Sequence, residues 1–397
     1  MKDVYQASLK LHKKLRGKIS ITSQASLKSK KDLSLLYTPG VAEPCRAIAK
    51  NPQSIYDYTW KHNTIAIISD GSSVLGLGNI GAAASLPVLE GKSLLFKELA
   101  GINCVPLALQ TQKPNEIIAI IKQLMPNFGA ICLEDIAAPH CFLIEEQLQG
   151  LSIPVVHDDQ HGTAIVLLAA LINACKVTGK NIDELKIVIS GAGAAGIAIT
   201  KTLLCTGLDK NICNPVKEII VCDKKGPIYQ GRKEDMNPFK TWIAQHTNHQ
   251  KIKGTLATAL NKADVFIGVS APHLVNEDMI RTMNKNPIVF AMANPVPEIE
   301  PEQALKAGAA VVGTGRSDYP NQINNVLAFP GLFKGTLQAR AKSVNGQMKL
   351  AAAHAIASCV KPTKENILPS PLDKNVAKKV AAAVVHAAKK TGVSFTK

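Results

Sequence analysis

One stretch constrains the fold of this 397-residue chain more than any other. In "LKIVISGAGAAGIAITKTLL", a short apolar run at 186–190 leads directly into a G-x-G-x-x-G loop at 191–196, and a helix-forming segment follows. Glycines at these positions permit a tight turn and let a phosphate approach the helix N-terminus. The pattern predicts a strand, a phosphate-binding loop and a helix, the opening unit of a dinucleotide-binding α/β domain.

The next apolar run, "EIIVC" at 218–222, ends in Asp223, whose carboxylate is placed to accept hydrogen bonds from an adenine-ribose diol. This favours NAD, because a 2′-phosphate would meet a negative charge. The adjacent lysines could hold that phosphate, so NADP stays open. The predicted cofactor-binding residues are Gly191, Ala192, Gly193, Ala194, Ala195, Gly196, Asp223 and Lys224.

A second G-x-G-x-x-G, "GLGNIG" at 76–81, does not meet the same physical requirements. The apolar run "TIAIIS" ends at Asp70, and the rest of "DGSSVL" intervenes before the first glycine. No acid-tipped strand follows at the right distance. We therefore expect these glycines to shape a tight loop against the second domain.

Short apolar runs alternate with segments of helical length along the chain, which is typical of β-α units and parallel sheets. The predicted strands lie at 64–69, 103–109, 129–134, 153–157, 186–190, 218–222, 264–269, 287–292 and 309–314. The length favours two domains. We predict an α/β protein with an N-terminal α/β domain, residues 1–160. A C-terminal Rossmann-like domain with a doubly wound parallel sheet, residues 161–397, ends in a helical tail at 372–390.

Charge and composition indicate which classes of partner to expect. The chain has 46 Lys and Arg against 30 Asp and Glu, a net charge of +16. The lysines are dispersed and aromatic residues are few, which favours a solvated surface over nucleic-acid binding. No apolar run approaches the ~18–20 residues that span a bilayer, so no membrane partner is expected.

Nine cysteines, with no C-x-x-C pair, favour buried thiols in a reducing compartment over a disulfide framework or a zinc site. A cytoplasmic location is expected. The basic, serine-rich first 31 residues have the composition of a transit peptide, but an amphipathic helix over 4–15 is the preferred interpretation.

Carboxylates follow three predicted strands of the first series: Asp70, the pair Glu134 and Asp135, and the pair Asp158 and Asp159. The carboxyl ends of parallel strands share one edge, ~5 Å apart. Clustered carboxylates repel unless a cation lies among them, and oxygen ligands select Mg²⁺ or Mn²⁺. Helix capping is the alternative, favoured for Asp70, whereas the two pairs favour a metal.

A zinc site built on the two histidines that flank the second pair, His157 and His161, is not favoured. No cysteine or third histidine stands at zinc spacing in this segment. We expect His140 to be a loop or packing residue.

Seven motifs occur in order: "YTPGVAEPC" (37–45), "SDGSSVLGLGNIGAAASLPVLEGKSLLFKELAGI" (69–102), "CLEDIAAPHCF" (132–142), "HDDQHGTAIV" (157–166), "GAGAAG" (191–196), "MANPVPEI" (292–299) and "NNVLAFPG" (324–331). Together they resemble the malic enzymes, in the short bacterial-type form. The resemblance implies a homodimer that oxidatively decarboxylates L-malate to pyruvate and CO₂, using NAD or NADP and Mg²⁺ or Mn²⁺.

The resemblance also implies residue roles. Tyr37 would be the general acid that protonates the enolate carbon, Lys92 the base that deprotonates the malate 2-hydroxyl, and Asp158 the support for that base. The metal ligands would be Glu134, Asp135 and Asp159. Asn294, Asn324 and Asn325 would contact substrate and nicotinamide.

The sequence departs from the long eukaryotic members, which carry a carboxylate-binding arginine in the loop after "DG". Ser72 and Ser73 stand in the corresponding loop here, so backbone amides of "GLGNIG" are a hypothesis for that role. Two other functions stay open at this point. One is a different two-domain Rossmann dehydrogenase, and the other is a basic, NAD(H)-sensing protein that binds nucleic acid.

Overall fold

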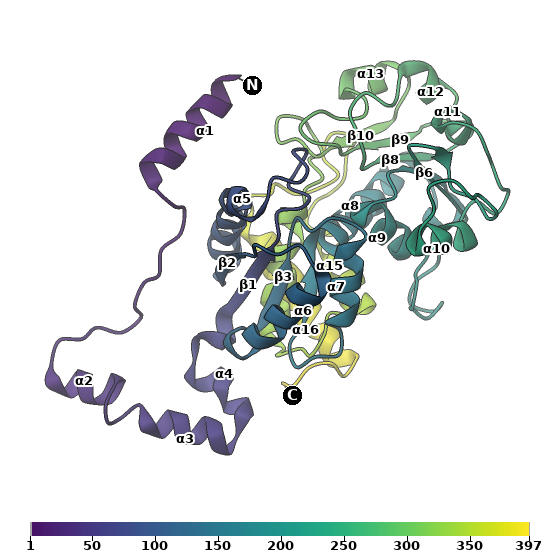
Figure 1. Cartoon of the computed structure of the whole chain (residues 1–397). Coiled ribbons are helices and arrows are strands. Elements are labelled where there is room, and N and C mark those ends of the chain that lie inside the picture. Colours follow the sequence, from purple (N-terminus) through teal and green to yellow (C-terminus); the bar gives the residue numbers. More distant parts are fainter. Residues whose placement is uncertain (1, 397) are drawn as a thin grey trace.

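The computed structural model of the chain describes residues 2–396 and contains two sheets flanked by helices (Figure 1). The first has the order β2-β1-β3-β4 and the second β10-β9-β8-β5-β6-β7. The strands of the first sheet are β1 (Thr64–Ser69), β2 (Asn103–Ala108), β3 (Ala130–Leu133) and β4 (Val155–His157). Those of the second are β5 (Lys186–Ser190), β6 (Glu218–Asp223), β7 (Gly226–Pro227), β8 (Val265–Gly268), β9 (Ile288–Ala291) and β10 (Val311–Thr314).

All nine predicted strands are present, and their pairings are parallel. The short β7, which was not predicted, pairs antiparallel with β6. Helices cover both faces of the parallel strands, so all of them except the edge strand β2 are buried almost throughout and read as continuous apolar runs. The α/β fold class is confirmed.

The strand order determines where a ligand can bind. In the second sheet the chain runs outward from β5 to β6, then returns to β8 on the other side of β5. The crevice between the ends of β5 and β8 is thus a topological switch point, the usual ligand site of open parallel sheets. The predicted glycine loop follows β5 directly.

Helix α8 (Asp158–Thr178) connects the two sheets and packs against α9 (Ala194–Leu203) and α15 (Gly346–Ala357). The expectation that no apolar run approaches membrane-spanning length is wrong for this helix. Its 21 residues are long and apolar enough by composition, yet 67% of its most apolar window is buried inside the protein. Core packing on several sides accounts for the apolar sequence.

The C-terminal helices return to the first sheet. Helix α16 (Lys374–Lys390) packs on α14 (Phe329–Gln338) and α15. Phe329 and Phe333 of α14 contact Phe96, with ring centroids 4.7 and 5.4 Å apart. The tail therefore shares a core with the N-terminal half, and the predicted division at residue 160 stays a prediction.

Residues 2–50 form an arm that extends from the body, purple in Figure 1. It contains α1 (Lys2–Leu15), α2 (Lys30–Leu36) and α3 (Ala42–Lys50). Neither α2 nor α3 has a buried residue. Large apolar side chains of the arm are exposed: Val4, Tyr5, Leu9, Leu11, Leu15, Ile19, Ile21, Leu27, Leu33, Leu35, Leu36, Tyr37 and Val41. These side chains are left uncovered in the single chain.

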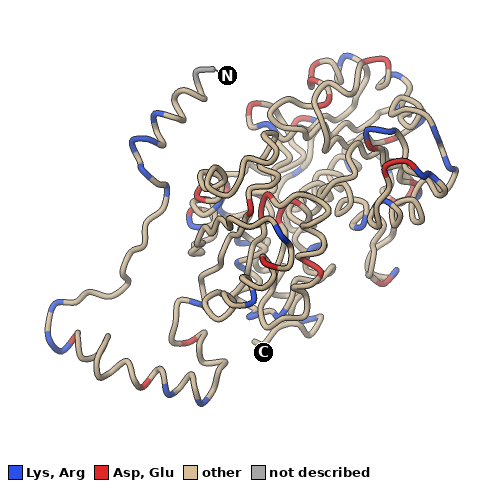
Figure 2. The backbone as a smooth tube through the Cα atoms, viewed as in Figure 1, with Lys and Arg blue, Asp and Glu red and all other residues tan. Residues whose placement is uncertain are grey.

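The expectations about the basic residues and about the cysteines have different outcomes. Lys and Arg are dispersed over the body and the arm (Figure 2), as the sequence indicates. The cysteine expectation is wrong for one pair, because Cys205 and Cys213 form a disulfide across the loop after α9. Their Cα atoms are 5.7 Å apart, a proximity that the loop conformation creates and spacing alone does not reveal. Five of the remaining cysteines are buried free thiols.

Candidate active site

The carboxyl edge of the first sheet gathers three of the predicted acids. Glu134 and Asp135 follow β3, and Asp159 lies in the first turn of α8, directly after β4. One carboxylate oxygen from each lies within 4.8 Å of the others. Asp159 is further held by the backbone N–H of Asp135, which donates to its Oδ2 at 2.8 Å. The site thus offers three oxygen ligands from adjoining strand ends.

The electrostatics of this group favour a cation. Burial raises the pKa of Glu134 well above its usual range and that of Asp135 to about 7, and neighbouring Asp159 adds to both shifts. Burial also opposes the charge of Asp159, but the imidazole of His157, 3.2 Å away, together with Lys92 and the Asp135 backbone N–H, lowers that pKa to about 2. Asp135 Oδ2 is buried without a hydrogen-bond partner among the described residues. An orphaned carboxylate oxygen beside two others fits Mg²⁺ or Mn²⁺.

Lys92 reaches the same edge from the last turn of α5 (Ala82–Leu95), where the helix dipole favours a cation. Its Nζ lies 2.5 Å from Glu134 and also pairs with Asp158. Asn325 donates to Asp158 from Nδ2 at 2.7 Å. Burial lowers the pKa of Lys92, but Asp158 and Glu134 outweigh burial and raise it well above its usual range.

Two residues near this edge have structural roles. Asp70 accepts hydrogen bonds from the backbone N–H and the hydroxyl of Ser72, at 2.9 and 2.6 Å, within the loop after β1. The expectation that it caps the next helix is wrong, because α5 begins only at Ala82 and its N-cap residue is Gly81. Asp70 stands outside the three-acid group. His157 is fully buried beside Asp159, and its backbone N–H donates to Glu145 at 3.0 Å. The described residues show no set of histidine and cysteine ligands for zinc here.

The glycine loop after β5 has the geometry of a phosphate cradle. A Cβ on Gly191, where φ is +122°, would lie 2.6 Å from the Val269 carbonyl oxygen. A Cβ on Gly196 would lie 1.8 Å from the Gly191 carbonyl oxygen. A Cβ on Gly193, the N-cap residue of α9, would meet no atom within 4 Å. Two glycines therefore serve packing, and the third leaves open space at a helix N-terminus for an anion.

Two cavities meet at this loop. A cavity of about 800 Å³ lies on one side, lined by Gly191, Ala192, Asp223 and Lys224. A cleft of about 470 Å³ lies on the other, lined by Gly193, Ala194 and Ala195 together with Lys92 and the three acids. Ser270 lines both. An extended dinucleotide laid across the loop would have its adenosine in the first and its nicotinamide beside Lys92 in the second.

Asp223 is not a free carboxylate in this structure. Both guanidinium nitrogens of Arg232 donate to it, and Lys240 Nζ lies 2.8 Å from its Oδ2. Burial opposes its charge, but these partners lower its pKa to about 2. Lys224 stays largely exposed, 3.7 Å from Asp235. Sequence reasoning missed Arg232 and Lys240, because neither lies in a recognisable motif.

The second glycine loop lies against the second sheet, as predicted. A Cβ on Gly76 would be 2.6 Å from the Asn294 carbonyl oxygen. Leu75, Gly76, Asn294, Asn324 and Asn325 all line the 470 Å³ cleft.

Glu298 is a further residue that sequence reasoning missed. It is fully buried, and its carboxylate accepts from the backbone N–H groups of Ser270 and Ala293, both at 3.0 Å. It thereby holds together the loops that follow β8 and β9. Its place inside "MANPVPEI" was the signal that could have identified it.

Tyr37 is the predicted catalytic residue that the structure does not bring to the site. It is 66% exposed at the end of α2 on the arm and does not line the cleft. Figure 1 shows α2 apart from both sheets. Within one chain, the Lys92 cleft has no tyrosine among its lining residues in the described range 2–396.

A glycine-loop domain that shares a cleft with a buried lysine and a carboxylate group defines a class, the two-domain dinucleotide-dependent oxidoreductases. Within that class, residues 16–149 match the family described as "Malic enzyme, N-terminal domain", and residues 160–389 match "Malic enzyme, NAD binding domain". The chain belongs to the malic enzyme family, whose members oxidise and decarboxylate malate. This membership decides against the alternative of a different dehydrogenase.

Individual relatives are similar over nearly the whole chain. A "Bifunctional malic/malolactic enzyme" of Bacillus subtilis (strain 168) is 51% identical over 393 residues, which cover 98% of this chain and 94% of that protein. A "Probable NADP-dependent malic enzyme" of Rickettsia prowazekii (strain Madrid E) is 49% identical, covering 99% of this chain and 52% of that longer protein. The crystal structure of an NAD-dependent malic enzyme from Thermotoga maritima superposes with a TM-score of 0.91 at 46% identity, over 95% of this chain and 98% of that one.

Proposed function

We propose that the cleft around Lys92 converts L-malate to pyruvate and CO₂ with transfer of a hydride to a nicotinamide cofactor. One observation carries the proposal: Lys92 lies in a single cleft with the three acids and the N-terminus of α9. A base, a site for a hard cation and a dinucleotide loop are the components that this reaction needs.

Lys92 takes the proton of the malate 2-hydroxyl while the hydride on C2 leaves to the nicotinamide. The resulting keto acid loses CO₂, and the electron pair of the broken bond to C3 forms an enolate. A proton from Tyr37 to C3 then converts the enolate to pyruvate. A Mg²⁺ or Mn²⁺ ion on Glu134, Asp135 and Asp159 supplies, when bound, electrostatic stabilisation of the enolate oxygen. Carboxylate charge holds the proton on Lys92 in the metal-free protein, and neutralising that charge lowers its pKa toward working pH.

Asp158 orients Lys92 in this scheme, and Asn325 orients Asp158. Asn294 and Asn324 line the cleft where substrate and nicotinamide would meet. The malate carboxylate is assigned to backbone amides of the "GLGNIG" loop, of which Gly76 lines the cleft. Substituting Gly78 or Asn79 should raise the malate KM, and an unchanged KM would remove the loop from the proposal.

The acid is supplied by a second copy of the chain. The arm carries Tyr37 on a surface of exposed apolar side chains, which a homodimer interface would bury. An arm that crosses to the partner would bring Tyr37 to the partner's cleft. This arrangement supports a homodimer with shared active sites.

We assign NAD as the cofactor, with NADP also accepted. Asp223 disfavours a 2′-phosphate, but Arg232 and Lys240 neutralise it, and Lys224 and Lys225 line the same cavity. Both kinds of dependence occur among the printed names of the relatives. A cytoplasmic enzyme that acts on a small molecule, without nucleic acid or membrane, suits the dispersed charge and the burial of α8.

The test follows reduced-nicotinamide absorbance with L-malate and Mn²⁺, in parallel with NAD and NADP, and then with EDTA. We expect equal amounts of pyruvate and reduced cofactor, faster with NAD, and loss of both on chelation. Reduction that continues in EDTA, or reduction without pyruvate, would refute the mechanism.

A further inference from the structure

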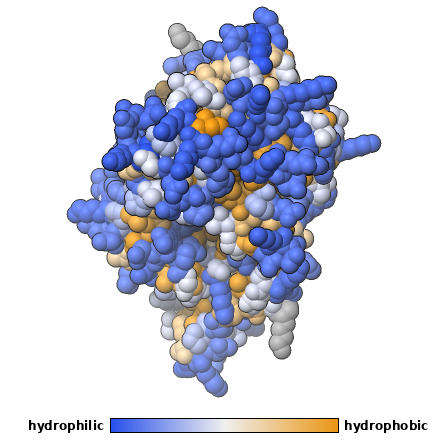
Figure 3. Space-filling view, turned by 90° about the vertical axis from the view of Figure 1, so that its right-hand side faces the viewer, coloured by the Kyte–Doolittle hydropathy of each residue, from blue (hydrophilic) through white to orange (hydrophobic). Residues whose placement is uncertain are grey.

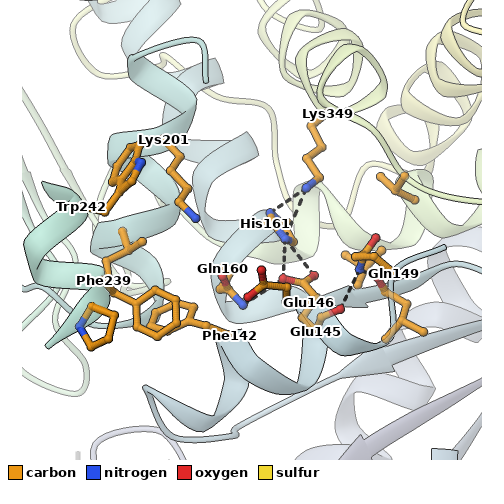
Figure 4. Close-up of a pocket in the computed structure, with 15 residues that line it drawn as sticks. Phe142, Glu145, Glu146, Gln149, Gln160, His161, Lys201, Phe239, Trp242 and Lys349 are labelled. Atoms are coloured by element: carbon orange, nitrogen blue, oxygen red, sulfur yellow. Dashed lines mark hydrogen bonds and ion pairs between the residues drawn. The ribbon is translucent and has the colours of Figure 1, made fainter. Parts of the chain in front are cut away.

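A second cleft, away from the Lys92 site, has the features of a ligand site (Figure 4). Its volume is about 510 Å³, and it lies among α7 (His140–Gln147), α8, α9, α10 (Pro238–His246) and α15. A neighbouring cavity of about 240 Å³ shares its central residues, which are Glu145, Gln160, His161, Lys201 and Lys349. We call the two together the α10 cleft. Figure 3 shows the right-hand side of the molecule, where several separate hydrophobic patches lie among hydrophilic side chains.

The polar centre of the α10 cleft contains two ammonium groups, those of Lys349 and Lys201, that could donate hydrogen bonds to a ligand. Glu145 accepts from the His157 backbone N–H at 3.0 Å and from Gln160 at 3.1 Å, and it pairs with His161 at 2.9 Å. Among the described residues, the hydrogen-bonding partners of Lys349 Nζ are the two His161 nitrogens, at 3.0 and 3.3 Å. Among residues 2–396, no carboxylate oxygen lies within 4.0 Å of the Nζ of Lys349 or of Lys201. Burial lowers the pKa of Lys349, because the protein interior disfavours an ammonium charge that has no close counter-ion.

An aromatic wall stands beside these lysines. Phe142 and Phe239 are in ring contact, with centroids 4.3 Å apart. Lys201 Nζ lies 5.4 Å from the centre of the Trp242 ring, and in Figure 4 the amine end of Lys201 points toward the open part of the cleft. Trp242 is backed by His246, stacked at 4.3 Å. A planar group could lie along this wall while an attached anion reaches the lysines.

We propose that the α10 cleft binds a small organic anion that joins a phosphate or carboxylate group to an aromatic body. The anionic group pairs with Lys349 and Lys201, and the aromatic body packs on Phe239 and Trp242. Charge and shape both support this ligand class. Two ammonium groups that have no carboxylate partner among the described residues favour an anion, and the apolar wall distinguishes an aromatic anion from inorganic phosphate.

Binding here is coupled to the metal site, a step that rests on the proposed function. Glu145 bridges the two sites: it pairs with His161 in the α10 cleft and accepts the His157 backbone N–H, and the His157 ring adjoins Asp159. An anion that draws Lys349 and His161 changes the position of Glu145, and with it the imidazole beside the metal ligand. Ligand and cation must then alter each other's affinity by the same factor.

The binding test uses the intrinsic fluorescence of Trp242 and does not depend on activity. The chain has two tryptophans, so a Trp60→Phe background leaves Trp242 as the reporter. Metal-free protein is titrated with phenyl phosphate and, separately, with inorganic phosphate. We expect saturable quenching by phenyl phosphate, with a Kd at least about tenfold lower than that of inorganic phosphate. Equal affinity for the two probes, or no saturation at millimolar concentration, would overturn the proposal.

Three lysine variants locate the site. Lys349→Met and Lys201→Met should each weaken phenyl phosphate about tenfold, the loss of one charge-assisted contact. Lys201 is solvent-exposed, so its variant remains informative if the Lys349 variant folds poorly. Lys378→Met on α16, exposed and outside the cleft, is the matched control and should bind as the parent does. Unchanged affinity in the two cleft variants would assign the quenching to another surface.

Coupling is measured as Mn²⁺ affinity with and without phenyl phosphate. The same titration on Lys201→Met corrects for Mn²⁺ that the probe itself binds. We expect phenyl phosphate to shift the Mn²⁺ Kd of the parent more than that of the variant, and equal shifts would overturn the coupling. If phenyl phosphate binds as expected but the protein does not turn over malate, only the proposed function is refuted, because neither titration uses substrate.

Discussion

Mixing two inactive variants tests where the general acid comes from. Tyr37→Phe removes the proposed acid, and Lys92→Met removes the proposed base. Each variant alone should form inactive homodimers, because every site lacks one group. The arm substitution should leave stability nearly unchanged, since Tyr37 is 66% exposed.

The expected recovery follows from the geometry. If the arm crosses, the Tyr37 of a Lys92→Met subunit serves the partner's intact Lys92, and each heterodimer has one complete site. Random exchange of equal amounts makes about half of the dimers mixed, so activity should return to about a quarter of the parent value. If the arm serves its own subunit, both sites of every heterodimer are defective and no activity returns.

The assay is malate-dependent reduction of NAD after the variants are mixed and allowed to exchange. Mass measurement of tagged subunits confirms that heterodimers have formed. A matched control mixes Lys92→Met with Asp158→Asn, two changes within one cleft, which should give no recovery under either arrangement. Heterodimers that stay inactive in the first mixture would refute the crossed arm. Full activity of Tyr37→Phe alone would refute Tyr37 as the acid.

Three further predictions follow from the site. The pKa of Asp135 is raised to about 7, first by burial, so below that pH its carboxyl holds a proton that a cation must displace. Mn²⁺ affinity should fall about tenfold per pH unit below about pH 7 and level off above it, and calorimetry that finds no proton release near about pH 6 would contradict this. Asp223→Ala should raise the NADP to NAD ratio of kcat/KM about tenfold by freeing its cationic partners, and an unmoved ratio would exclude Asp223 as the discriminator. Gly193→Ala should change the free energy of unfolding by no more than about 0.5 kcal/mol yet weaken NAD binding, because its Cβ enters only the open cradle. Gly196→Ala should lower the free energy of unfolding by about 2–3 kcal/mol, because its Cβ would lie 1.8 Å from a carbonyl oxygen, and equal thermal stability of the two variants would refute this assignment of glycine roles.

Much of the fold could be predicted because its signals lie within short stretches of the sequence. Each buried parallel strand is a continuous apolar run, and the three clustered acids lie just after such runs, so strand positions and the edge they share could be derived together. The glycine loop was equally readable, because its requirements lie within one strand-turn-helix unit. The two-residue β7 was missed, since it has no apolar run of its own and exists only through its pairing with β6.

Several contacts within the two clefts join segments that are distant in the sequence. Asn325 meets Asp158 across 167 positions, and Lys349 meets His161 across 188, in both cases because the C-terminal segment returns to α8. No local pattern encodes such a meeting, since it depends on how the helices pack. The Cys205–Cys213 bridge is shorter in range but depends equally on the path of a loop.

By itself, the sequence determined the strands, the glycine cradle and the row of carboxylates, because each depends on chemistry within a few residues. Tertiary structure decided which groups share a cleft. It tied Asp223 to Arg232, set Lys92 between two carboxylates and left Tyr37 on an arm apart from the Lys92 cleft of the same chain. These outcomes depend on the packing of whole helices and on the surface that a single chain leaves uncovered, which no local pattern of residues records.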